Sequence, residues 1–403
     1  MPTRAQVCPW IAVLGLLVPS LVAGQDRTER EVVELIVRDG PRARAIRAEV
    51  EVTRREQLAR LASPNPSVTY SREGAGFTEF LQAEQSLPIF GARAALSRAG
   101  VAATAAAEAE RDARLWLLRS DAATAVARVV AEQARLESAR ADVREVERLI
   151  AILRTREREG EGSRFDRLRA EQELRDTNQL VTSAAVALTE ARATLSSMLP
   201  RDVSLTAIAA AQIPRQSPVP MEDLLTRATS TRAELRALHQ LGERATREAE
   251  AARRARLPSP TVSGGVKRAD DGSGRDTGGV FGLSVAVPLF DAGRREAARW
   301  DAERARVEAE RASIEYRIRS EITGASEVLT VRQTALSRDQ QGAADELVQI
   351  AEVAYREGEV GILELLDAVR TASRARMRSI DLRLDARLAQ IALERAVGDV
   401  LWP

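Results

Sequence analysis

Leu87-Pro88-Ile89-Phe90 returns as Val287-Pro288-Leu289-Phe290, and Arg158-Glu159-Gly160-Glu161 returns as Arg356-Glu357-Gly358-Glu359. Both pairs of landmarks lie about 200 residues apart and occur in the same order. A shared order at a shared spacing indicates a duplicated unit. Within each copy the pattern predicts a helical lead-in, a strand pair, a very long helix, a break at glycine and a return helix.

These landmarks divide the chain into a first repeat over 25–200, a linker over 201–220 that contains prolines, and a second repeat over 221–403. The elements predicted after the helical lead-in of the first repeat are a β-hairpin at 66–90 and long helices at 91–157 and 164–198. The elements predicted in the second repeat are short helices within 221–257, a β-hairpin at 260–288, and long helices at 291–356 and 362–398.

The long helices carry the strongest signal because their apolar residues keep helical spacing over many turns. Leu115, Leu118, Ala122, Val126 and Val129 step by 3, 4, 4 and 3. Such a heptad pattern is typical of packed helices, and a helix of this length extends roughly 100 Å. One helical hairpin alone cannot bury the apolar seams that this spacing creates along its helices. We therefore expect neighbours, either within the chain or from other chains.

The second strand pair is clearer than the first. Residues 260–267 predict one strand, residues 268–279 read as a loop rich in Asp, Gly and Ser, and residues 281–287 alternate apolar with small or polar side chains. Period two with one apolar face predicts a strand between two environments. The two environments are core and water in a soluble sheet, or lipid and lumen in a transmembrane barrel. The alternation is compatible with both.

The composition favours packed helices over a bulky aromatic core, since aromatic residues are 3% and charged residues 30% of the chain. The net charge is +1 with both signs interleaved, so no basic surface for nucleic acid is predicted.

Residues 1–24 predict a secretory signal peptide, with Arg4 before an apolar run and Val22-Ala23-Gly24 for cleavage. A membrane anchor is the alternative. No later segment predicts a transmembrane helix, so we expect either a soluble exported protein or a barrel.

The sequence offers little for catalysis or metal binding. His239 is the only histidine, and Cys8, the only cysteine, lies within the predicted signal peptide. A zinc site needs several such ligands, and nucleophilic triads need a base beside a nucleophile. We therefore expect no enzyme activity, no metal and no cofactor. Energy for any transport would have to come from a partner.

Four stretches of the chain together resemble a known family. Residues 285–294 resemble its strand-to-helix junction, residues 354–359 and 362–368 its periplasmic tip, and residues 393–398 its closing helix. With the duplicated order of elements, the chain is similar to TolC, the bacterial outer-membrane efflux protein family. The resemblance covers essentially all of residues 25–403.

The resemblance implies a mainly α-helical fold with a small β-barrel part, assembled as a homotrimer. Each protomer would contribute four strands to a twelve-stranded barrel in the lipid of the outer membrane. The helices would form a periplasmic tunnel. The implied function is a passive exit duct of a tripartite efflux system. Its implied partners are a periplasmic adaptor of the membrane fusion type and an inner-membrane transporter such as the resistance-nodulation-division type.

The resemblance also implies roles for individual residues at the tip. Glu364 and Asp367 match the acidic pair that rings the family's pore constriction, and Tyr355 matches a tyrosine that helps to hold the closed state. Val360 stands where the family has a latching arginine, so a different closing network is expected. The alternatives are ordinary solvated charges and a packing tyrosine. Gly160 and Gly358 are expected to supply the backbone freedom of the tip turns.

Three other functions remain open from the sequence. A periplasmic adaptor also has a long helical hairpin, although usually a single one flanked by β-rich domains. A soluble coiled-coil scaffold would require that residues 260–288 do not form a barrel hairpin. An exit duct of type I secretion would share the architecture and differ in cargo, which is selected by the pump.

Overall fold

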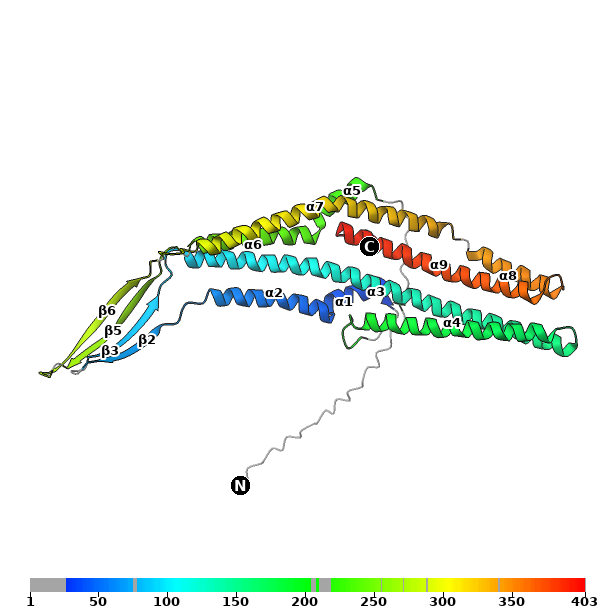
Figure 1. The fold of residues 1–403 in the computed structure, drawn as a ribbon, viewed down its shortest axis with the longest axis horizontal. Helices are drawn as coiled ribbons and strands as arrows, with labels where there is room; N and C mark the ends of the chain where they lie inside the picture. Colours follow the sequence, from blue (N-terminus) through cyan, green and yellow to red (C-terminus); the bar gives the residue numbers. More distant parts are fainter. Residues whose placement is uncertain are drawn as a thin grey trace, which may run out of the picture.

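The computed structural model describes residues 27–74, 78–203, 208–209, 219–254, 256–270, 272–287, 289–339 and 341–402. The predicted signal peptide lies outside these residues, as does most of the predicted linker. The molecule is a long rod with a β-sheet at one end and helices that extend to the other end (Figure 1).

Two hairpins form one four-stranded antiparallel sheet in the order β2-β3-β5-β6. The strands are β2 (Ser67–Glu73), β3 (Thr78–Ser86), β5 (Pro260–Asp270) and β6 (Arg275–Val285). Because β3 pairs with β5, the sheet joins the two repeats. The loop predicted over residues 268–279 is shorter than expected: both strands extend into it through the pairs Arg268–Thr277 and Ala269–Asp276. Cross-strand pairing overrides the turn-like composition there.

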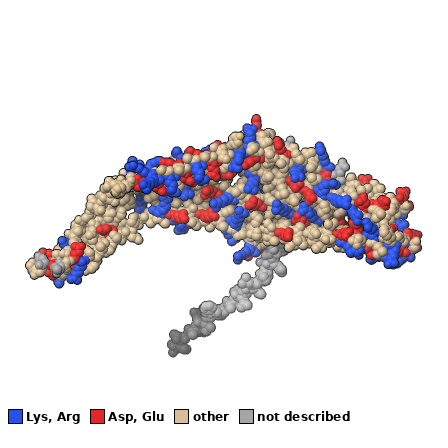
Figure 2. Space-filling model, viewed as in Figure 1, with Lys and Arg blue, Asp and Glu red and all other residues tan. Residues whose placement is uncertain are grey.

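The register gives the sheet two different faces, since directly opposed residues lie on the same side. One face is exposed, and its part nearer the helices is apolar, while Arg72, Glu79 and Arg268 lie on the same face at the far end. The apolar residues of this face are Val68, Tyr70, Leu81, Ala83, Val262, Val266, Phe281, Leu283 and Val285. The other face carries mostly small or polar side chains, among them Thr69, Ser71, Gln82, Glu84, Ser263, Lys267 and Ser284. Charged residues gather at the far end of the sheet, and the part nearer the helices has few (Figure 2).

The helices of the first repeat are α1 (Glu29–Asp39), α2 (Pro41–Arg60), α3 (Ala92–Glu159) and α4 (Arg164–Ser196). Thr28 caps α1 with a reciprocal capping box to Glu31, and Pro41 starts α2 directly after Gly40. A two-residue parallel pair, β1 (Arg27–Thr28) and β4 (Ile208–Ala209), lies beside these helices.

The helices of the second repeat are α5 (Met221–Thr231), α6 (Ala233–Arg254), α7 (Arg294–Ser337), α8 (Gln341–Arg356) and α9 (Ile362–Val397). The structure corrects the prediction of one unbroken helix over 291–356, because α7 ends at Ser337 and α8 begins at Gln341. Asp339 and Gly342 are weak helix formers at this point, and they weaken the helix just where it is interrupted.

The predicted heptad seams are buried, as their spacing requires. Leu118, Ala122, Val126 and Val129 of α3 lie in one cluster with residues of α1 and α4. Further along, α3 packs against α8 and α9 in a second cluster. Near the sheet, α3 packs instead against α6 of the other repeat. Of the helices described, none is both long and apolar enough to span a membrane.

Candidate gate at the helical tip

Both repeats turn at the tip through a glycine in the left-handed region. Gly160 has φ of 81° and Gly358 has φ of 79°. In each turn the next residue donates its backbone N–H back into the helix: Glu161 to the carbonyl of Arg156 and Glu359 to the carbonyl of Ala354, both at 2.9 Å. Glycine adopts this conformation without steric cost, so the placement predicted for both residues follows from backbone geometry.

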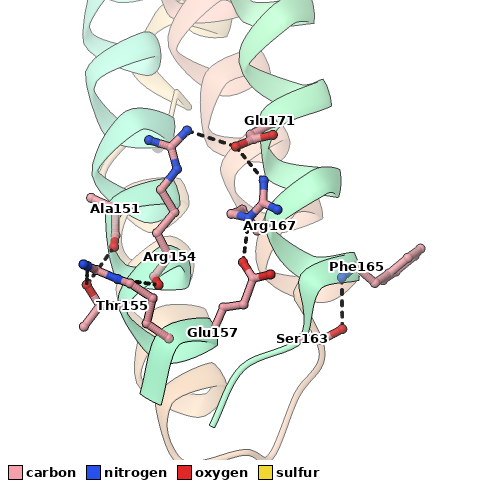
Figure 3. Close-up of polar contacts among 9 residues, drawn as sticks. Ala151, Arg154, Thr155, Glu157, Ser163, Phe165, Arg167 and Glu171 are labelled. Atoms are coloured by element: carbon pink, nitrogen blue, oxygen red, sulfur yellow. Dashed lines mark hydrogen bonds and ion pairs between the residues drawn. The ribbon is translucent and has the colours of Figure 1, made fainter. Parts of the chain in front are cut away.

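A charged network holds the first turn closed between α3 and α4 (Figure 3). Arg167 donates to Glu157 at 2.6 Å across the turn and to Glu171 at 2.9 Å. Arg154 on α3 reaches the same Glu171 carboxylate at 3.0 Å. Ser163 caps α4 by accepting the backbone N–H of Phe165 at 3.1 Å. The pKa of Glu171 is lowered because both arginines donate hydrogen bonds to its carboxylate, first Arg154 and then Arg167.

Tyr355 links the second repeat to this turn. Its hydroxyl donates to Oδ2 of Asp166, in the first turn of α4, at 3.0 Å. The guanidinium of Arg156 lies 5.4 Å from the centre of the tyrosine ring. Burial raises the pKa of Tyr355 to about 12, helped by the hydrogen bond to Asp166 and by its negative charge. The hydroxyl therefore stays protonated and donating at neutral pH.

Two more contacts hold α8 and α9 to the first repeat. Arg148 of α3 donates to Glu352 of α8 at 2.9 Å. Arg370 of α9 forms a bidentate pair with the buried carboxylate of Glu173 of α4. This hydrogen bonding raises the pKa of Arg370 above the usual arginine value. The second hairpin is thus attached to both helices of the first.

A cluster around Arg376 lies further from the tip, and Asp142 is its buried member. Arg376 of α9 donates to Asp142 of α3 at 2.8 Å and to Asp345 of α8 at 2.7 Å. Ser373 donates to the other oxygen of Asp142 at 2.5 Å. The Asp142 side chain is only 2% exposed, so its charge depends on these donors. The cluster ties three helices together close to the start of α8.

The predicted acidic pair is not part of these contacts. Glu364 and Asp367 are exposed on α9, while Leu365 and Leu366 between them are buried. At a spacing of three residues they share one helix face, away from the tip core. Val360 packs against that core, so the position of the family's latching arginine is apolar here.

The sequence did not predict the partners Asp166, Glu173, Arg370 and Arg376. The sequence does hold a signal for two of these ion pairs, because their acidic members Asp142 and Glu173 occupy seam positions between buried residues of α3 and α4. A charged residue at a seam position needs a partner across the seam.

Among the described residues no group of three or more His, Cys, Asp or Glu could hold a metal, and His239 is exposed.

Comparison with known proteins agrees with this architecture. Residues 224–399 match the sequence model of the outer membrane efflux protein family. This part of the chain is similar to that family, and the similarity to TolC-type proteins predicted from the sequence is confirmed.

A curated relative is the cation efflux system protein CusC of Escherichia coli K12, which is 28% identical over 162 residues. The alignment covers 37% of this chain and 34% of CusC, about a third of the relative's length.

Solved structures extend the likeness to the whole chain. A crystal structure of CusC superposes with a TM-score of 0.71 at 20% identity, covering 93% of each chain. The open-state MtrE outer membrane channel of Neisseria gonorrhoeae gives a TM-score of 0.73 at 19% identity, covering 94% of this chain and 90% of MtrE. The chain therefore has the fold of outer membrane efflux channels.

Proposed function

We propose that this protein is the outer-membrane exit duct of a tripartite efflux system, and that three copies form the duct. The observation that carries the proposal is the sheet at the end of the rod. The part of its exposed face nearer the helices is apolar over all four strands, with Phe281 89% and Leu283 70% exposed. Such a face is stable in lipid and unfavourable in water.

The sheet also supports assembly with other copies. Strands β2 and β6 are its two edges, and their outer backbone groups lack a strand partner among the described residues. In lipid such groups must be satisfied by another strand. Three protomers that pair β6 of one with β2 of the next would close a twelve-stranded barrel, with the polar face toward the lumen.

We propose that the helices continue this barrel as a tunnel through the periplasm, with the tip as its gate. The Tyr355–Asp166 hydrogen bond and the Arg370–Glu173 pair hold the second hairpin against the first. Together with the Arg376 cluster they would supply the closing network that Val360 cannot provide. Opening would require these contacts to break, and a periplasmic adaptor docking at the tip would favour that state.

The pump and the adaptor follow from the same proposal. A passive duct needs a partner, and an inner-membrane transporter such as the resistance-nodulation-division type would supply energy and select cargo. The family match and the channel fold support this arrangement. The relative CusC is named a cation efflux protein. Cations are therefore the first cargo class to test, and the exposed Glu364 and Asp367 would favour them.

The test is reconstitution of the mature protein in detergent and then in planar bilayers. We expect light scattering to give the mass of three protein chains and bilayers to show channels of low open probability. A protein that stays monomeric and folded in buffer without detergent would contradict the proposal and favour the soluble scaffold.

A further inference from the structure

We propose that four arginines at the helix end of the sheet bind the phosphate headgroups of anionic phospholipids. This arginine collar consists of Arg254, Arg256, Arg294 and Arg295. The inference rests on the proposed insertion of the sheet into a membrane. It adds a lipid class and a binding surface that the proposed duct does not require.

The collar lies where the apolar face of the sheet ends. Pro260 pairs with Val285, so the start of β5 and the end of β6 share one edge of the sheet. Arg256 precedes that edge by a few residues, and beyond β6 the side chains of Val287, Leu289 and Phe290 are exposed, Phe290 fully. Arg294 then begins α7. The arginines thus flank the apolar surface on both chain segments.

A second contact keeps these segments side by side. Arg253, beside Arg254 at the end of α6, donates to both carboxylate oxygens of Asp301 of α7, at 2.9 and 2.6 Å. The end of α6 is therefore held along the first turns of α7. Figure 2 shows basic side chains gathered where the helices meet the sheet.

The charge of the collar is not neutralised within the chain. All four side chains are exposed, and the described residues provide no ion pair to any of them. Two of the three carboxylates nearby pair with arginines outside the collar, and the third, Asp291, accepts the backbone N–H of Arg295. Their contacts are Arg253 to Asp301 at 2.6 Å, Arg299 to Glu296 at 2.7 Å, and the backbone N–H of Arg295 to Asp291 at 3.3 Å.

The charges at the opposite end of the sheet balance one another. Its charged residues have both signs and pair with one another: Arg268 lies 3.8 Å from Glu79, and Arg275 lies 3.2 Å from Asp270. A positive excess at only one end of an apolar band favours an anionic ligand at that end. A guanidinium donates two parallel hydrogen bonds to a phosphate, and its apolar stem can lie along the lipid-facing surface.

The test uses the full mature chain in nanodiscs made from phosphatidylcholine alone or from an equal mixture with phosphatidylglycerol. Native mass spectrometry then counts the lipids that the released protein retains. The collar variant is R254Q/R256Q/R294Q/R295Q. The matched control, R164Q/R169Q/R227Q/R236Q, removes the same charge from exposed arginines of α4, α5 and α6 remote from the sheet.

Wild-type protein and the control should retain phosphatidylglycerol in excess over its share of the bilayer. Each arginine near an anionic surface favours binding by about fivefold, so even if only two of the four contacts count, the collar variant should lose about 25-fold of this preference. Added salt should weaken the preference of the wild type. The long-range part of the attraction is screened as the Debye length shortens.

The outcomes separate the two proposals. Wild-type protein that enters both bilayers but retains the two lipids in proportion overturns the collar and leaves the duct intact. Equal losses in the collar variant and in the control also overturn it, since net charge would then be the cause. Wild-type protein that enters neither bilayer overturns the duct and the collar together.

Discussion

At the scale of single residues, the tip is held by a few groups whose charges are partly buried. Tyr355 is 9% exposed, and its hydroxyl has one acceptor, the Asp166 carboxylate. A hydrogen bond to a charged acceptor contributes more than a neutral one, about 1.5–3 kcal/mol. The contact joins residues far apart in sequence, so it couples the two repeats directly.

Tyr355→Phe should weaken the closed tip and raise the channel's open probability in planar bilayers. It should also remove one step from the alkaline titration of tyrosine absorbance. The folded pKa, about 12, lies above the ordinary value of 10. The stabilising contribution is therefore fully present below pH 10 and is lost as pH rises through 12.

Tyr316→Phe is the matched control, because Tyr316 is 89% exposed on α7. It should keep the high-pH step and the wild-type open probability. Equal open probability of the two variants would remove the gating role of Tyr355 and leave it a packing residue.

Arg376→Met should destabilise the helical part by about 3 kcal/mol, because Asp142 would remain buried with only the Ser373 hydroxyl as a donor. Thermal unfolding followed by circular dichroism measures the loss. The double variant Arg376→Met with Asp142→Leu should recover most of it, since the buried charge is then absent. A single variant that melts at the wild-type temperature would show that the cluster is not needed for stability.

At the scale of secondary-structure elements, the two faces of β6 differ between adjacent residues. Leu283 belongs to the apolar face and Ser284 to the polar one. Leu283→Arg should therefore cost about 2–4 kcal/mol of membrane insertion. Ser284→Arg, with the same new side chain, should be tolerated. The measurement is the amount of each variant recovered in outer-membrane fractions, and equal recovery would argue against a lipid-facing Leu283.

The interruption between α7 and α8 is the main difference between the two repeats. In the first repeat α3 extends without interruption from Ala92 to Glu159. In the second, the helix restarts at Gln341, close to Asp345 in the Arg376 cluster. Besides that cluster, the Arg148–Glu352 and Tyr355–Asp166 contacts also hold this short helix to the first repeat. In our gating proposal these two contacts and the Arg376 cluster would have to break before the second hairpin could move.

At the scale of the whole molecule, we expect the acidic pair Glu364 and Asp367 to select ions only when several copies of the chain assemble. One protomer presents Glu364 and Asp367 to solvent, whereas three around an axis would form two stacked acidic rings. Glu364→Ala with Asp367→Ala should lower cation selectivity and move the reversal potential in a salt gradient toward zero. Glu357→Ala with Glu359→Ala removes the same charge from the turn and should have little effect. Unchanged reversal potentials in the first variant would contradict the constriction.

The periodic parts of this fold could be predicted from local sequence. Heptad spacing predicted α3, α4 and α9, glycine predicted the tip turns, and alternation predicted β6. Each of these patterns depends on neighbours within a few residues. The end of α7 and the length of β5 were less predictable, because helix propensity and strand pairing compete there over small energy differences.

The side-chain contacts of the tip required the folded chain. Tyr355 meets Asp166, and Arg370 meets Glu173, only because two hairpins from separate repeats pack side by side. Charged residues are so frequent here that spacing along the chain cannot pair them. Local order follows from periodicity, which acts over one or two turns. The choice of partner follows from three-dimensional packing, which brings together residues almost 200 positions apart.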